Sequence, residues 1–323
     1  MPIQDVLANF GIEIKSITKT NAIIRLKNAS EDVKLSKLLF EKLNAAVDNN
    51  VNVTKHIKLP NITFGVEFEF IGSSTYLDKS AFDIAMFKLI GEKYINAGKY
   101  AHNDGTYWIL GKDSSIHYDS SVIEHPTGYE LSTPALNFNN PADLNLFKQV
   151  IVLIKKHLKG YVNTTCGTHI HLGFTRDKLF KDNIKSVLIT YSNIESKVFD
   201  PIVPSSRRRN RYCKKTTDSI PGKYQKVSSR YCKFDSYNEC KCLHFEFRQL
   251  EGTLDENLIL NWLHLHALIM FDLINNSNNE TYLNNLSNKN IFDLLFYYGF
   301  DSDIISFFID RVIKFKSKTI QQS

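Results

Sequence analysis

The sequence lacks any hydrophobic run near the roughly 20 residues that a membrane-spanning helix needs. Its first residues, MPIQDVLANFGIEIK, also lack the basic segment followed by an apolar stretch that marks a secretory signal. These absences argue against a membrane partner and against export. We therefore expect the chain to work in the cytoplasm.

Cysteine is too scarce for a disulfide framework, with five residues in a chain of 323. An odd number in a long chain favours a reducing compartment. Four of the five, Cys213, Cys232, Cys240 and Cys242, lie close together, but they lack the paired C-x2–4-C spacing of zinc knuckles. The sequence does not decide whether this group binds a metal.

The net charge of +6 is not spread evenly. Ten basic residues and one acidic residue lie between Arg207 and Lys233, which leaves 30 of the 40 basic and 33 of the 34 acidic residues for the rest of the chain. A basic surface throughout would favour non-specific nucleic-acid binding, whereas one basic segment fits a phosphate-bearing ligand at least as well.

Hydrophobic periodicity predicts two parts. Residues 1–57 read as a small α/β unit, with a hairpin at 11–27, an amphipathic helix at 32–47 and a polar linker after it. In residues 58–323 we expect strands at 58–71, 104–116, 127–136, 167–174 and 242–250, a loop-like stretch at 201–241, and helices at 79–96, 140–158, 181–199, 255–275, 291–298 and 302–314. Since strands and helices do not alternate regularly, the pattern favours an α+β fold over a doubly wound α/β fold.

Several predicted strands carry ionisable groups on one face. In ITFGVEFEFIG (62–72), apolar residues alternate with Glu67 and Glu69, and in GTHIHLGF the two histidines His169 and His171 lie two residues apart. Residues i and i+2 share a face in a strand but diverge in a helix. These pairs therefore make sense only as strand pairs.

The same arrangement recurs later in the chain. LHFEFRQLEGT places His244, Glu246 and Arg248 on one side, and GYELSTP adds Glu130 in another extended segment. A solvated sheet face is the simplest interpretation of any one such strand, but it would normally mix lysine, threonine, serine and glutamine. Here only Glu, His and Arg occur.

Carboxylates that cluster on one sheet face repel one another, so a partner must neutralise their charge. Two carboxylates at the strand spacing of about 7 Å repel by roughly 2–3 kcal/mol at an effective dielectric near 20. Hard divalent cations would neutralise them, and Mg²⁺ commonly shares its ligand shell with substrate phosphates. The residue types therefore predict a nucleotide–metal site and fit a zinc hydrolase poorly.

The segments FGVEFEF, GYELSTP, NTTCGTHIHLG and HFEFRQLEGTLDENLILNW, in this order over about residues 61–270, resemble the amidoligase family. CGTHIHLG and EFRQLEGT are the most specific pieces. That family is similar to glutamine synthetase and glutamate–cysteine ligase. The resemblance implies a curved antiparallel sheet flanked by helices, whereas the helical C-terminus is predicted from periodicity alone. The resemblance also implies ATP-dependent ligation of a carboxylate to an amine through an acyl phosphate.

Residue roles follow from the same resemblance. The implied ligands of Mg²⁺ (or Mn²⁺) are Glu67, Glu69, Glu130, His169 and Glu246. The implied catalytic residues are Arg248 and His171, which would contact the transferred phosphoryl group, and Asp113, which would orient the amine. The implied ATP contacts are Arg207, Arg211 and Arg248.

Two other functions stay open at this point. The same carboxylates could serve a metal-dependent phosphohydrolase or nucleotidyltransferase, and residues 207–233 could bind nucleic acid. Cys166, beside the HxH strand, suits a small packed residue better than a nucleophile. The sequence identifies neither the carboxylate nor the amine, which could belong to a peptide or protein. It also leaves open the role of residues 1–57 and whether the chain forms an oligomer, as related synthetases do.

Overall fold

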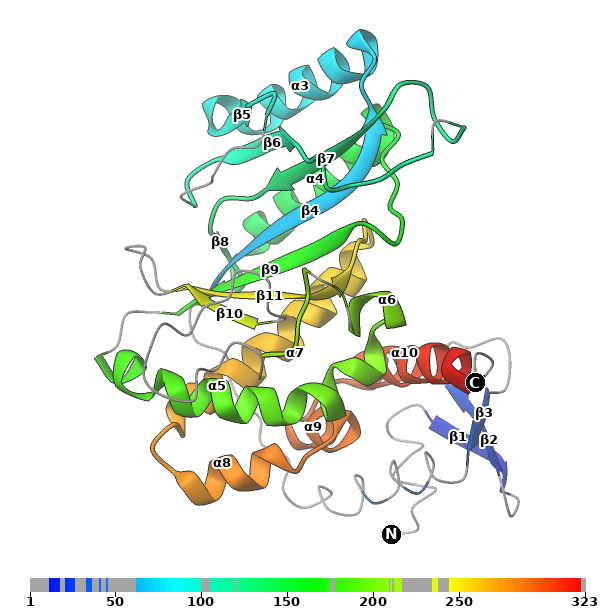
Figure 1. The fold of residues 1–323 in the computed structure, drawn as a ribbon, viewed down its shortest axis with the longest axis vertical. Coiled ribbons are helices and arrows are strands. Elements are labelled where there is room, and N and C mark those ends of the chain that lie inside the picture. Colours follow the sequence, from blue (N-terminus) through cyan, green and yellow to red (C-terminus); the bar gives the residue numbers. More distant parts are fainter. Residues whose placement is uncertain are drawn as a thin grey trace. The chain divides into compact units, whose positions relative to one another are not determined.

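The computed structural model describes residues 12–17, 21–26, 33–36, 41, 45, 62–99, 105–119, 121–174, 178–208, 210, 212–216, 234–237 and 244–320. They form an α+β structure with an eight-stranded sheet flanked by helices, which confirms the predicted fold class at this level (Figure 1).

The chain divides into two compact units. One comprises residues 59–182 and 206–269, and the other comprises residues 1–58, 183–205 and 270–323. Compactness alone does not define a domain, so the expected division into residues 1–57 and 58–323 stays a prediction.

The eight-stranded sheet belongs to the unit that contains residues 59–182 and 206–269. Its strand order is β10-β11-β9-β4-β7-β6-β5, with β8 also paired to β4. All neighbouring strands are antiparallel except β5 and β6, which are parallel. The strands are β4 (Thr63–Ser73), β5 (Tyr94–Asn96), β6 (Trp108–Lys112), β7 (Pro126–Ser132), β8 (Leu136–Asn137), β9 (Gly167–Gly173), β10 (Phe234–Tyr237) and β11 (His244–Glu251).

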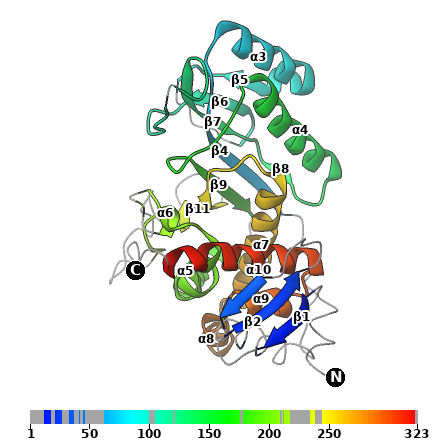
Figure 2. The ribbon, with the colours of Figure 1, turned by 90° about the vertical axis from the view of Figure 1, so that its right-hand side faces the viewer.

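Helices cover one face of this sheet. They are α3 (Tyr76–Ile90), α4 (Pro141–His157) and α7 (Glu256–Asn275), and Figure 2 shows α3 and α4 on the same side of the strands. The ring of Phe147 on α4 lies 5.8 Å from that of Phe64 and 5.5 Å from that of Phe68, and Phe247 lies 4.4 Å from His266 on α7. The apolar sides of β4 and β11 therefore face the helices, and their ionisable sides face the other way.

The helix α4 begins as the sequence predicts. The Asn140 side chain accepts a hydrogen bond from the Ala142 N–H, and Pro141 takes the first helical position, where its missing N–H has no cost. α3 is shorter than predicted, because Gly91 at φ 61° ends it. The short helix η1 (Gly91–Lys93) and the strand β5 follow, where we expected helix up to residue 96.

The other unit has a three-stranded sheet of β1 (Ile12–Ile17), β2 (Asn21–Leu26) and β3 (Val33–Ser36). The antiparallel pairing of β1 with β2 confirms the predicted hairpin. The predicted helix at 32–47 is wrong over β3, which pairs with β2. The sequence VKLS alternates apolar and polar residues, so it fits a strand as well, and the partner strand decides the outcome.

Helices make up the rest of this unit. They are α5 (Lys178–Val198, which begins in the other unit), η2 (Asp200–Ile202), α8 (Glu280–Ser287), α9 (Ile291–Tyr297) and α10 (Ser302–Ile320). The predicted helical C-terminus is confirmed, although α8 was not predicted. The stretch 201–241 is not wholly loop-like, because it contains η2, α6 (Ser205–Arg208) and β10.

Among the described helices, α7 alone is long and apolar enough to cross a bilayer. Of its most apolar stretch, 67% is buried within the protein. That burial is typical of a core helix.

Candidate active site

The central strand β4 places its two carboxylates against two different neighbours. The register pairs Glu67 with His169 on β9, and it pairs Glu69 with Glu130 on β7. Directly paired residues share a face of the sheet. Three segments that are far apart in the sequence thus bring their ionisable groups together on the face opposite α4.

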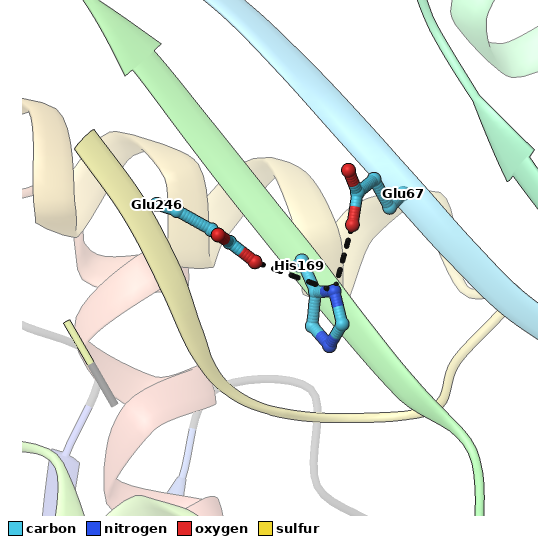
Figure 3. Close-up of side chains that lie close together, drawn as sticks. All are labelled: Glu67, His169 and Glu246. Carbon is cyan, nitrogen blue, oxygen red and sulfur yellow. Dashed lines mark hydrogen bonds and ion pairs between the residues drawn. The ribbon is translucent and has the colours of Figure 1, made fainter. Parts of the chain in front are cut away.

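Glu67, His169 and Glu246 form a first cluster (Figure 3). His169 Nδ1 lies 2.9 Å from Glu67 Oε2 and 3.6 Å from Glu246 Oε1. One possible ligand atom from each residue lies within 4.8 Å of the others. Figure 3 shows the two carboxylates directed toward the imidazole from β4 and β11, on either side of β9. Such a set can bind a divalent cation.

Glu69, Asp113 and Glu130 form a second cluster, whose possible ligand atoms also lie within 4.8 Å of one another. The two clusters adjoin, because Glu69 Oε1 lies 3.4 Å from His169 Nε2. The other oxygen, Glu69 Oε2, accepts a hydrogen bond of 2.6 Å from the Gly167 N–H. Three carboxylates in this cluster fit the preference of Mg²⁺ and Mn²⁺ for hard oxygen ligands.

Asp113 reaches the second cluster because the chain after β6 passes very close to β7. The Asp113 N–H donates to the Gly128 carbonyl at 3.0 Å, and a Cβ on Gly128 would lie 2.5 Å from the Asp113 carbonyl oxygen. The glycine of GYELSTP therefore permits this approach. A turn then fixes the carboxylate, whose Oδ1 accepts from the Ser115 N–H at 2.8 Å.

His171 lies beside the first cluster. Its Nε2 is buried and lies 3.3 Å from Glu67 Oε1, but outside hydrogen-bonding geometry, so it has no hydrogen-bond partner among the described residues. Its ring centroid lies 5.1 Å from that of His244. A buried nitrogen without a hydrogen bond, beside a cluster that could hold a cation, can donate to a ligand.

Arg248 lies in an irregular part of β11. The pairing of β11 with β9 shifts register between Phe247 and Leu250, which marks a β-bulge. At this shift the Arg248 carbonyl accepts hydrogen bonds from the guanidinium of Arg207 and, at 3.3 Å, from the Cys213 thiol. The bulge thus turns a backbone group of β11 toward α6 and the residues after it.

The Arg248 side chain is held on the site face. It donates to Glu246 in an ion pair and, through Nε, to the Tyr212 carbonyl at 3.3 Å. Two residues of one strand face thus supply an anion and a cation side by side, as the HFEFR pattern predicts.

Arg207 is almost fully buried, with 2% of its surface exposed. Its guanidinium lies over Gly167, where an added Cβ would come within 2.8 Å of Nη2. The described residues offer it no carboxylate partner. Four other residues named above, Arg211, Cys232, Cys240 and Cys242, lie outside the described residues, as does most of the basic segment 207–233.

The crowding of charges shifts the pKa values of the site. Burial, followed by the charges of Glu67, Glu69 and Asp113, raises the pKa of Glu130 well above its ordinary value. For Glu67, burial raises the pKa, but the neighbouring His171 and His169 together outweigh it and lower the pKa well below the ordinary value. The protonation of Glu67 and Glu130 therefore depends on the charges that surround them.

Cys166 is buried and packs against Gly252, where an added Cβ would lie 2.4 Å from the cysteine Cβ. Burial raises the pKa of its thiol to about 11. Little thiolate exists at neutral pH at such a pKa, so the packing role is favoured over a nucleophilic one.

Two features of the site were missed in the sequence. His244 was placed on the strand face of Glu246 and Arg248 but was given no role, although its ring lies 5.1 Å from that of His171. Asp113 was assigned to the amine, but nothing in its local sequence indicated that it would lie beside Glu69 and Glu130.

Comparison with known proteins identifies one family. The family model described as "Putative amidoligase enzyme" matches residues 60–244, more than half of the chain. A search of the curated proteins finds no match to this chain. Among solved structures, one described as "Apo GmaS without ligand" is 12% identical and covers 93% of this chain and 76% of its own, with a TM-score of 0.33. That score does not by itself establish a common fold.

Proposed function

Because the chain belongs to the amidoligase family, whose members join carboxylates to amines, we propose that it forms an amide or isopeptide bond at the expense of ATP, with Mg²⁺ or Mn²⁺ as cofactor. The observation that carries this proposal is the pair of adjoining clusters on one sheet face, Glu67–His169–Glu246 and Glu69–Asp113–Glu130.

The donor atoms of the two clusters fit the proposed cations. Five of the six side chains are carboxylates, and the sixth is the imidazole of His169. Oxygen-rich sets of this kind suit Mg²⁺ and Mn²⁺, whereas a zinc site would be richer in histidine or cysteine. When bound, the cations neutralise the phosphate oxygens of the nucleotide.

The chain's own residues hold and orient the reacting groups. An oxygen of the substrate carboxylate attacks the γ-phosphorus of ATP, the bond to the β-phosphate oxygen breaks, and ADP leaves. We assign two groups to donate hydrogen bonds to the transferred phosphoryl group: Arg248, which Glu246 and Tyr212 hold, and the buried Nε2 of His171. In-line positioning and charge stabilisation supply most of the catalysis in such a transfer.

The second step forms the new bond. The amine nitrogen attacks the carbonyl carbon of the acyl phosphate, phosphate leaves with the bonding electrons, and the nitrogen loses a proton. Asp113 is the member of the second cluster whose carboxylate we assign to orient the amine, beside the cation that Glu69 and Glu130 would hold. No nucleophile from the protein is needed, since the substrate carboxylate is the nucleophile of the first step.

The test is ADP release with Mg²⁺ over a matrix of carboxylates and amines, followed by mass spectrometry of the products. We expect ADP release to require one carboxylate–amine pair and to yield a condensed product smaller than the sum of the two by one water. ADP release that needs no amine and gives no condensed product would instead indicate a metal-dependent phosphohydrolase.

A further inference from the structure

The helix α3 presents a large apolar surface to solvent. Tyr76, Leu77, Ile84 and Phe87 are 84%, 79%, 56% and 59% exposed. Single exposed apolar residues are common, but a contiguous patch of this kind on one helix usually marks an interaction site. We call these four side chains the α3 patch.

The α3 patch cannot be buried by rotation of the helix. Phe82 and Met86 fill the opposite side of α3 and are fully buried. Asp83 is held by β5, whose Tyr94 hydroxyl donates at 2.6 Å and whose Asn96 amide donates at 2.9 Å. The helix is therefore fixed with its apolar patch facing outward.

The sequence of α3 makes the patch complementary to itself. Leu77, Ser80, Ile84 and Phe87 follow the 3–4 spacing of a helix-packing stripe. In an antiparallel pair with its twofold axis near residue 82, Leu77 meets Phe87 of a second copy, and Ile84 meets the small Ser80. The same register places Tyr76 against Lys88, where a cation–π contact can form.

The size of the patch agrees with a dimer of moderate strength. At about 150–250 Å² for a buried aromatic side chain and somewhat less for Leu or Ile, the exposed fractions sum to roughly 500 Å² per copy. Two copies would bury on the order of 1,000 Å², which is the lower limit of a specific protein–protein interface.

We propose that the chain forms a twofold dimer in which α3 packs antiparallel against α3 of a second copy. An isologous contact of this kind closes on itself and adds no further copies. It leaves the candidate active site open. Tyr94 and Asn96 of β5 point to α3, whereas Glu67 and Glu69 lie on the other face of the same sheet. The dimer is therefore independent of the proposed function.

The first test is sedimentation equilibrium of the full chain. We expect a monomer–dimer equilibrium with a dissociation constant in the micromolar range, as about 1,000 Å² of buried surface allows. The double variant Leu77→Glu/Phe87→Glu should weaken self-association by roughly 100-fold or more, because it places charges at the centre of the contact. Val152→Glu is the matched control, since Val152 on α4 is 57% exposed and lies outside the α3 patch.

Several outcomes would overturn the proposal. One is a wild-type chain that stays monomeric up to about 100 μM, well above the expected dissociation constant. Another is equal self-association of the wild type and the Leu77→Glu/Phe87→Glu variant. Leu77→Ser/Ile84→Ser provides a milder variant if the glutamates impair folding, which circular dichroism reports. Mg·ATP binding should be unchanged in all of these variants.

The second test examines the register. Ser80→Cys and Ile84→Cys chains are mixed and oxidised, and the antiparallel register predicts a disulfide-linked heterodimer in the mixture but little linkage in either chain alone. The wild-type chain measures the background from the native cysteines, of which Cys166 and Cys213 are buried. Efficient linkage of Ile84→Cys to itself would show a parallel pair and would contradict the proposed arrangement.

Discussion

At the scale of single residues, Arg248 is fixed from two sides. Its side chain pairs with Glu246, and its carbonyl accepts from Arg207 and Cys213 at the β-bulge. A guanidinium held in this way is preorganised for a planar phosphoryl group. We propose that Arg207, which is buried and donates to the Arg248 carbonyl, positions Arg248. The family resemblance instead assigns Arg207 to ATP.

We expect Arg248→Lys to lower the turnover number by roughly 10²–10³-fold, the loss typical of one preorganised charge-stabilising contact. The Michaelis constant for ATP should change less, because lysine keeps the charge but loses the bidentate fork. Steady-state kinetics and thermal unfolding on one preparation measure both effects. A less stable variant with normal turnover would place Arg248 in a structural ion pair.

A double variant that combines Arg207→Met with Arg248→Lys tests the role of Arg207. Arg207→Met alone should lower turnover by roughly 10–100-fold through a displaced Arg248, and adding it to Arg248→Lys should cost little more, because both act on one group. A phosphate contact would instead raise the Michaelis constant for ATP in each background. Lys214→Met, which removes an exposed cation close to α6, is the control.

At the scale of elements, β11 and α7 follow each other in the chain but have different roles. β11 carries Glu246 on the site face, whereas Glu256 lies in the first turn of α7. α7 contributes its buried aromatic side to the core, where His266 packs between Trp262 and Phe247. The same substitution can therefore be made at Glu246, inside the candidate site, and at Glu256, outside it.

Glu246→Gln should weaken Mn²⁺ binding, measured by calorimetry, by at least roughly 10–100-fold, since even outer-sphere changes can cost that much. Glu256→Gln should bind Mn²⁺ like the wild type and lose only about 0.3–1 kcal/mol of stability through the helix dipole. Equal Mn²⁺ affinity in the two variants would mean that β11 does not contribute to the cation site.

The buried His266 predicts a pH dependence of stability. Burial, only partly offset by the hydrogen bond to the Trp262 carbonyl, lowers its pKa to about 3. The unfolded chain takes up this proton near pH 6.5, so stability is full above that pH and falls as pH decreases toward 3. At pH 5.5 the loss is on the order of 1 kcal/mol relative to neutral pH.

Urea unfolding of the wild type and of His266→Phe at pH 7.5 and 5.5 isolates this contribution, because other groups titrate in both proteins. The phenylalanine fits an aromatic environment and does not titrate. An identical pH dependence of the two proteins would show that His266 is not kept neutral by burial.

At the scale of the whole molecule, the charge of the chain and the charge of its site have opposite signs. The chain carries +6, but the candidate site gathers five carboxylates on one sheet face. Local charge decides the interaction with a triphosphate, because salt screens distant charges over about 8 Å at physiological ionic strength. Overall basicity therefore does not predict nucleotide binding here.

Accordingly, Mg·ATP should bind at least roughly 100-fold more tightly than ATP in EDTA, since the carboxylates repel the free triphosphate. Calorimetry of the purified chain with and without the cation tests this. Equal affinities would contradict the assignment of the two clusters to cations, and nucleotide binding would then have to rest on basic residues.

The sequence predicts much of the site because strand periodicity is local. The alternation in FGVEFEF, GTHIHLG and HFEFRQL fixes which side chains share a face without knowledge of their neighbours. Strands with a weaker pattern were not predicted in this way. β3 alternates over four residues only, and β5 has three, so sheet partners rather than local sequence select their structure.

The sequence by itself thus determined the α+β class, the two-faced strands and the residue types of the candidate site. Only the tertiary structure decided which groups meet. The strand order β11-β9-β4-β7-β6 and its register pair Glu67 with His169 and Glu69 with Glu130. They also bring Asp113 into the second cluster and direct the Arg248 carbonyl toward Arg207. Most of these pairings join residues more than 40 positions apart, and their choice depends on packing over the whole sheet, which no local pattern encodes.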